Sequence, residues 1–150
     1  MDTQLFVSTT TISRGRFEPI KNRGLVKPYG GLWTSTWEGE SSAWVRWASD
    51  NYKTLYRRQW WLIEPDPVAR ICTIETYEDL RGLVARYPAG HFSEYLDFET
   101  MAREFDAIHL TKKGQRATHF TFPESLYGWD CESTLWFRWS FLSAAALQYH

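Results

Sequence analysis

The sequence of residues 30–36 is Gly30-Gly31-Leu32-Trp33-Thr34-Ser35-Thr36, and it predicts a glycine turn that leads into a β-strand. The paired glycines permit a tight turn and allow a ligand or a neighbouring backbone to approach closely. The three hydroxyl side chains at the end of the predicted strand 32–35 are donors for ribose or amide oxygens, and Trp33 offers a ring for stacking. A glycine turn that enters an ordinary edge strand explains the same residues without a ligand.

A helix is predicted directly after this strand. Either Ser41 or Ser42 can cap a helix that continues through Asn51, because a serine oxygen at this position accepts a backbone N–H of the first helical turn. Trp44 and Trp47 recur at helical spacing, so the helix should carry one aromatic face.

A second informative segment lies near the other end of the chain and reads Leu126-Tyr127-Gly128-Trp129-Asp130-Cys131-Glu132, followed by Ser133-Thr134-Leu135-Trp136-Phe137. Asp130 and Glu132 are separated by one residue, and alternate residues of an extended chain point to the same side. The pattern predicts two carboxylates together at the mouth of a strand, beside Trp129, where their pKa values can be driven apart. A solvated turn before a strand is the alternative interpretation.

The remaining hydrophobic patterns predict strands and helices without any internal repeat. Besides 32–35, strands are expected at residues 5–8, 60–64, 68–74, 107–110 and 133–139, and residues 116–120 are expected to pair back after a turn at 112–114. Two further helices are expected, one capped by Thr76 and ending at 87–88, the other running from Asp97 through Phe105. About six strands and three helices, without regular βαβ alternation, favour a mixed α+β fold.

The composition places limits on the class of protein. A chain of 150 residues matches the size of one domain, so a single domain spanning 1–150 is expected. Some of the nine Trp residues must line a pocket or an interface, because each buried indole needs a partner for its N–H.

A formal charge of −1 argues against a protein held on nucleic acid mainly by bulk electrostatics. Cys72 and Cys131 have no CxxC spacing, so neither a disulfide framework nor a metal site is expected. No secretory leader or membrane span is evident, and we expect a cytoplasmic protein with no membrane segment.

Together, the two segments resemble the active-site elements of the ADP-ribosyltransferase superfamily, which includes bacterial toxins and the catalytic domains of poly-ADP-ribose polymerases. In that family a strand with a Ser-Thr-Ser element precedes a helix, and a late strand is entered by an acidic residue, a spacer and a glutamate. Thr34-Ser35-Thr36 corresponds to the first element and Asp130-Cys131-Glu132 to the second. The resemblance implies a split, mainly antiparallel sheet with about three helices and NAD+ as the co-substrate.

Roles for individual residues follow from this resemblance. Glu132 would be the catalytic glutamate, with Asp130 as its partner, and would stabilise the positive charge that develops on the ribose as nicotinamide leaves. The residues expected to bind NAD+ are Ser8, Thr9, Gly31, Trp33, Thr34, Ser35, Thr36 and Trp44. The family carries Arg or His on its first strand, whereas the first predicted strand here has neither, so Ser8 or Thr9 would have to supply that donor.

Two other features have simpler interpretations. His109 alternates with the apolar residues Ile108 and Leu110 and is predicted to be a solvent-facing strand histidine. The basic, glycine-broken stretch 14–31 is predicted to be a loop, which could contact the phosphates of NAD+ or of a polynucleotide.

The sequence leads to three hypotheses for the function. The first is a mono-ADP-ribosyltransferase, by analogy a toxin of a toxin–antitoxin or phage-defence system, which modifies a nucleic acid or a protein and is restrained by an antitoxin protein. The second is a non-enzymatic binding module whose Trp-rich surface contacts RNA or protein. The third is a ribonuclease-type toxin that uses His and Arg without NAD+.

Overall fold

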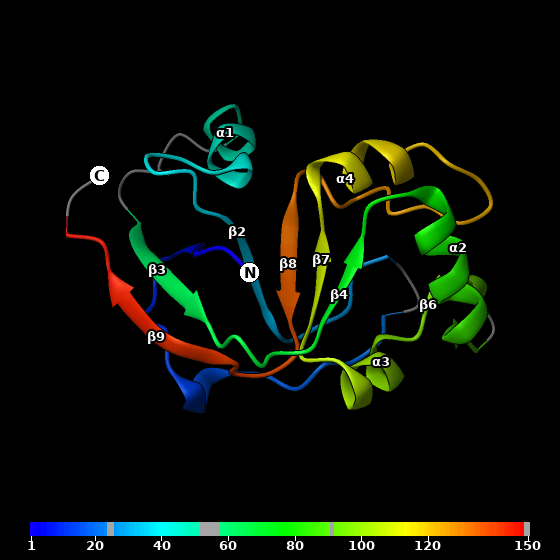
Figure 1. The fold of residues 1–150 in the computed structure, drawn as a ribbon, viewed down its shortest axis with the longest axis horizontal. Coiled ribbons are helices and arrows are strands. Elements are labelled where there is room, and N and C mark those ends of the chain that lie inside the picture. Colours follow the sequence, from blue (N-terminus) through cyan, green and yellow to red (C-terminus); the bar gives the residue numbers. More distant parts are fainter. Residues whose placement is uncertain (24–25, 52–57, 91, 149–150) are drawn as a thin grey trace.

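A strongly curled, seven-stranded sheet organises the computed structural model, which describes residues 1–23, 26–51, 58–90 and 92–148 (Figure 1). The strand order is β4-β7-β8-β2-β1-β3-β9, and the strands are β1 (Gln4–Ser8), β2 (Leu32–Thr36), β3 (Gln59–Pro65), β4 (Ile71–Ile74), β7 (Ala107–Leu110), β8 (Ser133–Trp136) and β9 (Phe141–Ala146). Neighbours pair antiparallel except β4 and β7, which are parallel. A separate antiparallel pair consists of β5 (Pro88–Ala89) and β6 (Phe92–Leu96). The predicted α+β class, with a mainly antiparallel sheet, is confirmed.

Within the described ranges, four α-helices flank the sheet: α1 (Ala43–Ser49), α2 (Tyr77–Arg86), α3 (Phe98–Glu104) and α4 (Lys112–Thr118). A short 3-10 helix, η1, spans Arg14–Arg16 in the predicted loop. The caps expected from the sequence start the first three helices, since Ser42, Thr76 and Asp97 each accept the backbone N–H three residues later. None of the described helices is long and apolar enough to cross a membrane.

The fourth helix corrects the sequence prediction for residues 112–120. The turn and hairpin strand expected there are wrong, because Lys112–Thr118 form α4. Thr111 caps the helix by accepting the backbone N–H of Gly114 at 2.9 Å. A Cβ on Gly114 would lie 2.0 Å from the carbonyl oxygen of Ile74, so tertiary packing requires glycine inside this helix. The residue that indicates a turn in the sequence instead permits close contact between α4 and β4.

The strands β4, β8 and β9 also differ from the prediction. β4 begins at Ile71 because Asp66 holds a turn before it, with its side chain accepting the N–H of Val68 at 3.0 Å. β8 ends at Trp136 instead of continuing to 139. β9 was not predicted, since its Ala and Ser residues have weak β-propensity, and its pairing with β3 supplies the missing stabilisation.

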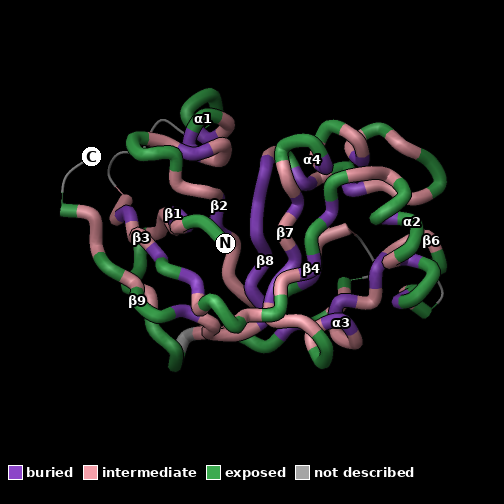
Figure 2. Tube along the Cα trace, viewed as in Figure 1, coloured by how far each residue is buried: buried purple, intermediate pink, exposed green. Residues whose placement is uncertain are grey.

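The hydrophobic core lies on both sides of the curled sheet. Ile108 and Leu135 are fully buried in the largest cluster, which α2 and α3 cover. A second cluster beneath α1 includes Leu5 and Trp60. β8 is buried along its whole length (Figure 2), and Glu132, which directly precedes this strand, is buried as well.

The sheet opens where β1 and β2 separate. These strands pair at two positions only, Gln4 with Thr36 and Leu5 with Ser35. Beyond this contact, β1 continues along β3 while β2 continues along β8. The result is two half-sheets joined by a short junction, with α1 above one half and α4 above the other (Figure 1).

A candidate active-site cavity at the sheet junction

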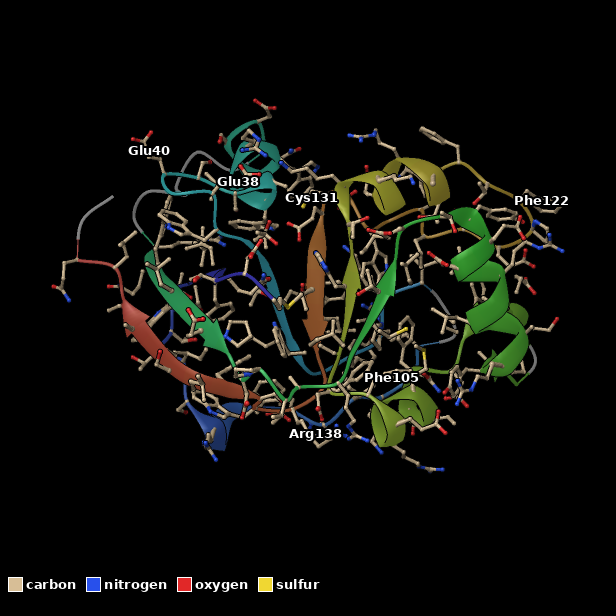
Figure 3. All side chains as sticks on the ribbon, viewed as in Figure 1. Glu38, Glu40, Phe105, Phe122, Cys131 and Arg138 are labelled. Carbon is tan, nitrogen blue, oxygen red and sulfur yellow. The ribbon has the colours of Figure 1, made fainter. Side chains whose placement is uncertain are left out.

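A cavity of about 290 Å³ lies between the diverging strands β1 and β2. Its lining residues come from both strands, from α1, from the segment before β8, from the first residue of β8 and from the loop before β2, and they are Leu5, Phe6, Val7, Lys27, Trp33, Thr34, Ser35, Trp44, Trp47, Trp129, Asp130, Cys131 and Ser133. In Figure 3, Cys131 stands at the start of β8, between α1 and α4. The two segments singled out in the sequence therefore border one cavity.

Tryptophan rings form the walls of this cavity. Trp33 packs edge-on against Trp129 with ring centroids 4.7 Å apart. Trp129 is 1% exposed, and its indole Nε1 donates to the carbonyl oxygen of Val26 at 2.7 Å, which satisfies its polar atom. Trp44 and Trp47 enter from α1. The cavity is thus bordered by rings whose positions are set by packing.

Ser35 joins the cavity to the residues behind it. Its hydroxyl donates to Glu132 Oε1 at 2.9 Å and accepts the backbone N–H of Trp44 at 3.2 Å. Since Ser35 also lines the cavity, one hydroxyl links the first turn of α1, the end of β2 and the residue that precedes β8.

Glu132 is a buried carboxylate held by four donors. It is 5% exposed and accepts hydrogen bonds from the Ser35 hydroxyl at 2.9 Å, the Thr36 backbone N–H at 3.0 Å, the Thr36 hydroxyl at 2.9 Å and His109 Nε2 at 2.7 Å. Burial raises the pKa of Glu132, but the hydrogen bonds from His109 and Thr36 outweigh it, so the net pKa lies below its ordinary value. The site therefore contains a fixed negative charge at neutral pH.

His109 is a functional candidate that the sequence prediction assigned to solvent. Ile108 and Leu110 are indeed fully buried, and His109 faces the other side of β7. That side is enclosed by the curl of the sheet: the His109 side chain is 19% exposed and contacts Glu132. The prediction of a solvent-facing histidine is wrong because alternation gives the face of a strand but not what covers it. No signal in the sequence indicated the pairing.

Asp130 and Glu132 have different partners, although their spacing predicts two carboxylates together. Residues 131–132 form a bend before β8 rather than extended strand, so the alternation rule does not apply to them. The Asp130 side chain is 39% exposed, lines the cavity and lies 3.7 Å from Lys27 Nζ. Lys27 Nζ in turn lies 5.5 Å from the centre of the Trp33 ring. The second carboxylate therefore belongs to an ion pair at the cavity and not to a pair of acids.

Four of the predicted NAD+-binding residues, Ser8, Thr9, Gly31 and Thr36, are not among the residues that line the cavity. The Ser8 hydroxyl lies 3.1 Å from that of Thr10. Gly31 has φ +69°, and a Cβ there would lie 2.5 Å from the carbonyl oxygen of Trp136. Its close approach is therefore to a neighbouring backbone, which is one of the two roles expected for the glycine pair.

The hydroxyls of Thr34 and Thr36 are already engaged within the protein. Thr34 borders the cavity, but its hydroxyl donates to Gln4 Oε1 at 2.8 Å and accepts from Trp136 Nε1 at 2.9 Å. The Thr36 hydroxyl is bound to Glu132. Of the three hydroxyl residues predicted to contact ribose, Ser35 is the one whose side chain joins the cavity to the glutamate.

An ion-pair bridge connects the two sides of the opening. Glu38, which follows β2, accepts hydrogen bonds from Arg46 of α1 and from Lys112 of α4. Hydrogen bonds from these two cations lower the pKa of Glu38 to about 2. Figure 3 shows Glu38 beside α1, near the start of β8. This carboxylate links the helices that stand above the two half-sheets.

Comparison of the chain with protein-family models, with curated proteins and with solved structures found no match. Among the described residues, no three His, Cys, Asp or Glu side chains are grouped closely enough to hold a metal ion. The function is therefore inferred from the geometry and the chemistry of this site.

Proposed function

We propose that this chain is an NAD+-dependent mono-ADP-ribosyltransferase with Glu132 as its catalytic glutamate. The observation that carries the proposal is the hydrogen bond between Ser35 and Glu132, 2.9 Å long although the residues are 97 positions apart. The Ser35 hydroxyl, at a strand end, lines a cavity with tryptophan walls, and the ionised Glu132 lies directly behind it, outside the cavity lining. This combination is what the resemblance to the superfamily implies for the nicotinamide-ribose site.

The cavity suits the nicotinamide-ribose end of NAD+. Its volume of about 290 Å³ lies at the lower limit for small-molecule sites, which typically have about 300–1,000 Å³. One end of the dinucleotide therefore enters, and the adenosine half lies outside. Trp33 and Trp44 offer rings to stack on the nicotinamide. Lys27 supplies a cation for the pyrophosphate, a role that replaces the missing Arg or His of the first strand.

The chemistry follows from the fixed charge of Glu132. In the transfer, the bond between ribose C1′ and the nicotinamide nitrogen breaks, and nicotinamide leaves with the bonding electrons. Positive charge then develops on the ribose, as in glycoside cleavage. The Glu132 carboxylate stabilises this charge. It also accepts a hydrogen bond from the ribose 2′-hydroxyl, which replaces the hydrogen bond from either the Ser35 or the Thr36 hydroxyl. The acceptor forms its bond to C1′ and releases its proton.

The proposal is tested by incubating the pure protein with labelled NAD+ and a cell lysate. Label on a macromolecule is expected for the wild type, and Glu132→Gln should lower the rate by about 10²–10³-fold. Glu40→Gln is the matched control, because Glu40 is exposed, is not among the residues that line the cavity, and lies at the edge of the view in Figure 3. Near-ultraviolet circular dichroism and thermal unfolding establish that the variants retain their fold.

Two results would contradict the proposal. Glu132→Gln with most of the wild-type activity would remove Glu132 from the mechanism. Degraded RNA with an unchanged nucleotide pool would favour a nuclease instead. If Glu132→Gln fails to fold, Trp44→Ala serves as a second variant, since Trp44 is a partly exposed wall residue. Its expected effect is weaker NAD+ binding with a raised KM, and an unchanged KM would count against the assigned cavity.

A further inference from the structure

An exposed aromatic cluster lies at the C-terminal end of α4, outside the proposed transfer chemistry. It consists of His119, Phe120 and Tyr127, whose ring centroids lie 4.5, 4.9 and 6.1 Å apart. Phe120 is 84% exposed and Tyr127 is 63% exposed. Large rings gathered together on a surface, unlike single exposed apolar residues, mark a binding site for another molecule.

Hydrogen bonds hold the loop that carries these rings. The Ser125 hydroxyl lies 3.1 Å from the carbonyl oxygens of both Thr118 and His119, and it accepts the backbone N–H of Tyr127 at 2.9 Å. Leu126 donates its N–H to the carbonyl of Thr118 at 2.9 Å. Rings on a pre-organised loop lose little conformational freedom when a ligand stacks on them, which favours binding.

The helix that precedes the rings carries exposed positive charge. Lys113 and Arg116 are exposed on α4, and Phe120 lies two residues beyond the end of this helix. The nearby carboxylate of Glu124 is engaged by Arg81 at 3.8 Å. The local charge therefore favours an anionic partner, and the rings favour a planar one.

The aromatic cluster is connected to the wall of the cavity. Gln115 Nε2 lies 3.3 Å from His119 Nδ1 and donates to the carbonyl oxygen of Trp129, also at 3.3 Å. Trp129 and Asp130 line the cavity, and Tyr127 precedes them in the same segment. The segment that carries Tyr127 therefore continues directly into the segment that lines the cavity, and Gln115 bridges His119 and Trp129.

We propose that the acceptor is a base of a single-stranded nucleic acid whose neighbouring bases stack on Phe120 and Tyr127; this inference rests on the transferase function proposed above. Unpaired bases present their faces to aromatic rings, whereas bases inside a duplex do not. Lys113 and Arg116 contact the phosphates. Two such contacts predict that log affinity falls against log salt with a slope of about −1.4, a weak dependence that agrees with the net charge of −1.

Binding is measured first, without NAD+, by fluorescence anisotropy with labelled oligonucleotides of mixed sequence. Single-stranded DNA, single-stranded RNA and a DNA duplex are the three probes, and we expect one or both single strands to bind more tightly than the duplex. The double variant Phe120→Ala/Tyr127→Ala should bind about 10-fold more weakly or worse. Leu142→Ala is the matched control, because Leu142 is equally exposed at 63% but lies on β9, at the other end of the sheet.

Transfer is measured next, with labelled NAD+ and the same single strands. Label on an oligonucleotide, lost in the double variant, supports the proposal and distinguishes DNA from RNA as the acceptor. Labelled lysate proteins without single-strand binding would overturn this inference and leave the transferase function standing. Single-strand binding without any transfer would overturn the acceptor assignment together with the transferase function. Affinity that is unchanged in the double variant, or equal for duplex and single strand, would overturn the assigned surface.

Discussion

Replacement of His109 by alanine removes one of the four hydrogen bonds that hold the Glu132 carboxylate. A hydrogen bond to an ionised group contributes about 1.5–3 kcal/mol to stability. The His109 side chain is 19% exposed, so water replaces part of the lost bond and the lower end of this range applies. The free energy of unfolding should therefore fall by about 1.5–2 kcal/mol. Urea denaturation at neutral pH measures this change.

A double-mutant cycle separates this hydrogen bond from general damage to the fold. His109→Ala is measured in the wild type and in Glu132→Gln, and we expect a coupling energy of about 1 kcal/mol or more, as for residues of one hydrogen-bond network. His119→Ala is the matched control, since the His119 ring contacts Phe120 and Tyr127. Its effect should add to that of Glu132→Gln within about 0.5 kcal/mol. Simple additivity of His109→Ala and Glu132→Gln would refute the reasoning.

The same contact determines how stability depends on pH. Burial raises the pKa of Glu132, and the hydrogen bonds from His109 and Thr36 lower it further than burial raises it. A carboxyl whose pKa is lowered in the folded state stabilises the protein above its unfolded pKa, and this contribution is lost as the pH falls through the folded pKa. Without His109 the folded pKa rises, so His109→Ala should lose stability at a higher pH than the wild type. Thermal unfolding across an acid titration measures this, and an unchanged acid midpoint would contradict it.

Two further predictions concern the backbone at Gly31 and the thiol of Cys131. Gly31→Ala should lower the free energy of unfolding by about 2 kcal/mol or more, because the φ of +69° and the carbonyl of Trp136 both oppose a Cβ. Gly39→Ala, at φ +97° in open space, isolates the backbone strain, and an equal cost for both variants would exclude the contact with Trp136. Cys131 should react slowly with iodoacetamide at neutral pH, because burial raises the pKa of its thiol to about 11. Mass spectrometry follows the labelling, and a rate equal to that of an unfolded-chain cysteine would contradict the prediction.

The sequence alone determined the elements whose causes are local. Thr76 and Asp97 were predicted as helix caps and act as caps, and of the two serines predicted for the first helix Ser42 is the cap, because the N–H groups that these residues satisfy lie three residues away in the same chain. The strands β1, β2, β3, β4, β7 and β8 were also predicted, and with them the α+β class, whereas β6 was not predicted. Such interactions are visible in the sequence because their partners are close along it.

Tertiary packing decided the elements whose causes are distant in the sequence. Gly114 stands inside α4 because the carbonyl of Ile74 leaves no room for a Cβ, and this contact is absent from any local pattern. β9 is a strand because β3 offers it a free edge. In both cases the local residue propensities disfavour the observed element, and a contact with a residue or strand distant in the sequence outweighs them.

In the candidate site, too, the sequence indicated some of the residues, whereas their contacts were decided by the fold. The residue types of Ser35 and Glu132 were recognisable from the sequence, whereas their contact depends on the order β7-β8-β2 in the sheet. The place of His109 was decided by the curl of that sheet, which encloses a face that alternation leaves open to water. A buried carboxylate needs hydrogen-bond donors, and these come from the strands that surround it. Because the packing of the whole chain sets the strand order, the donors of Glu132 could not be predicted from the sequence.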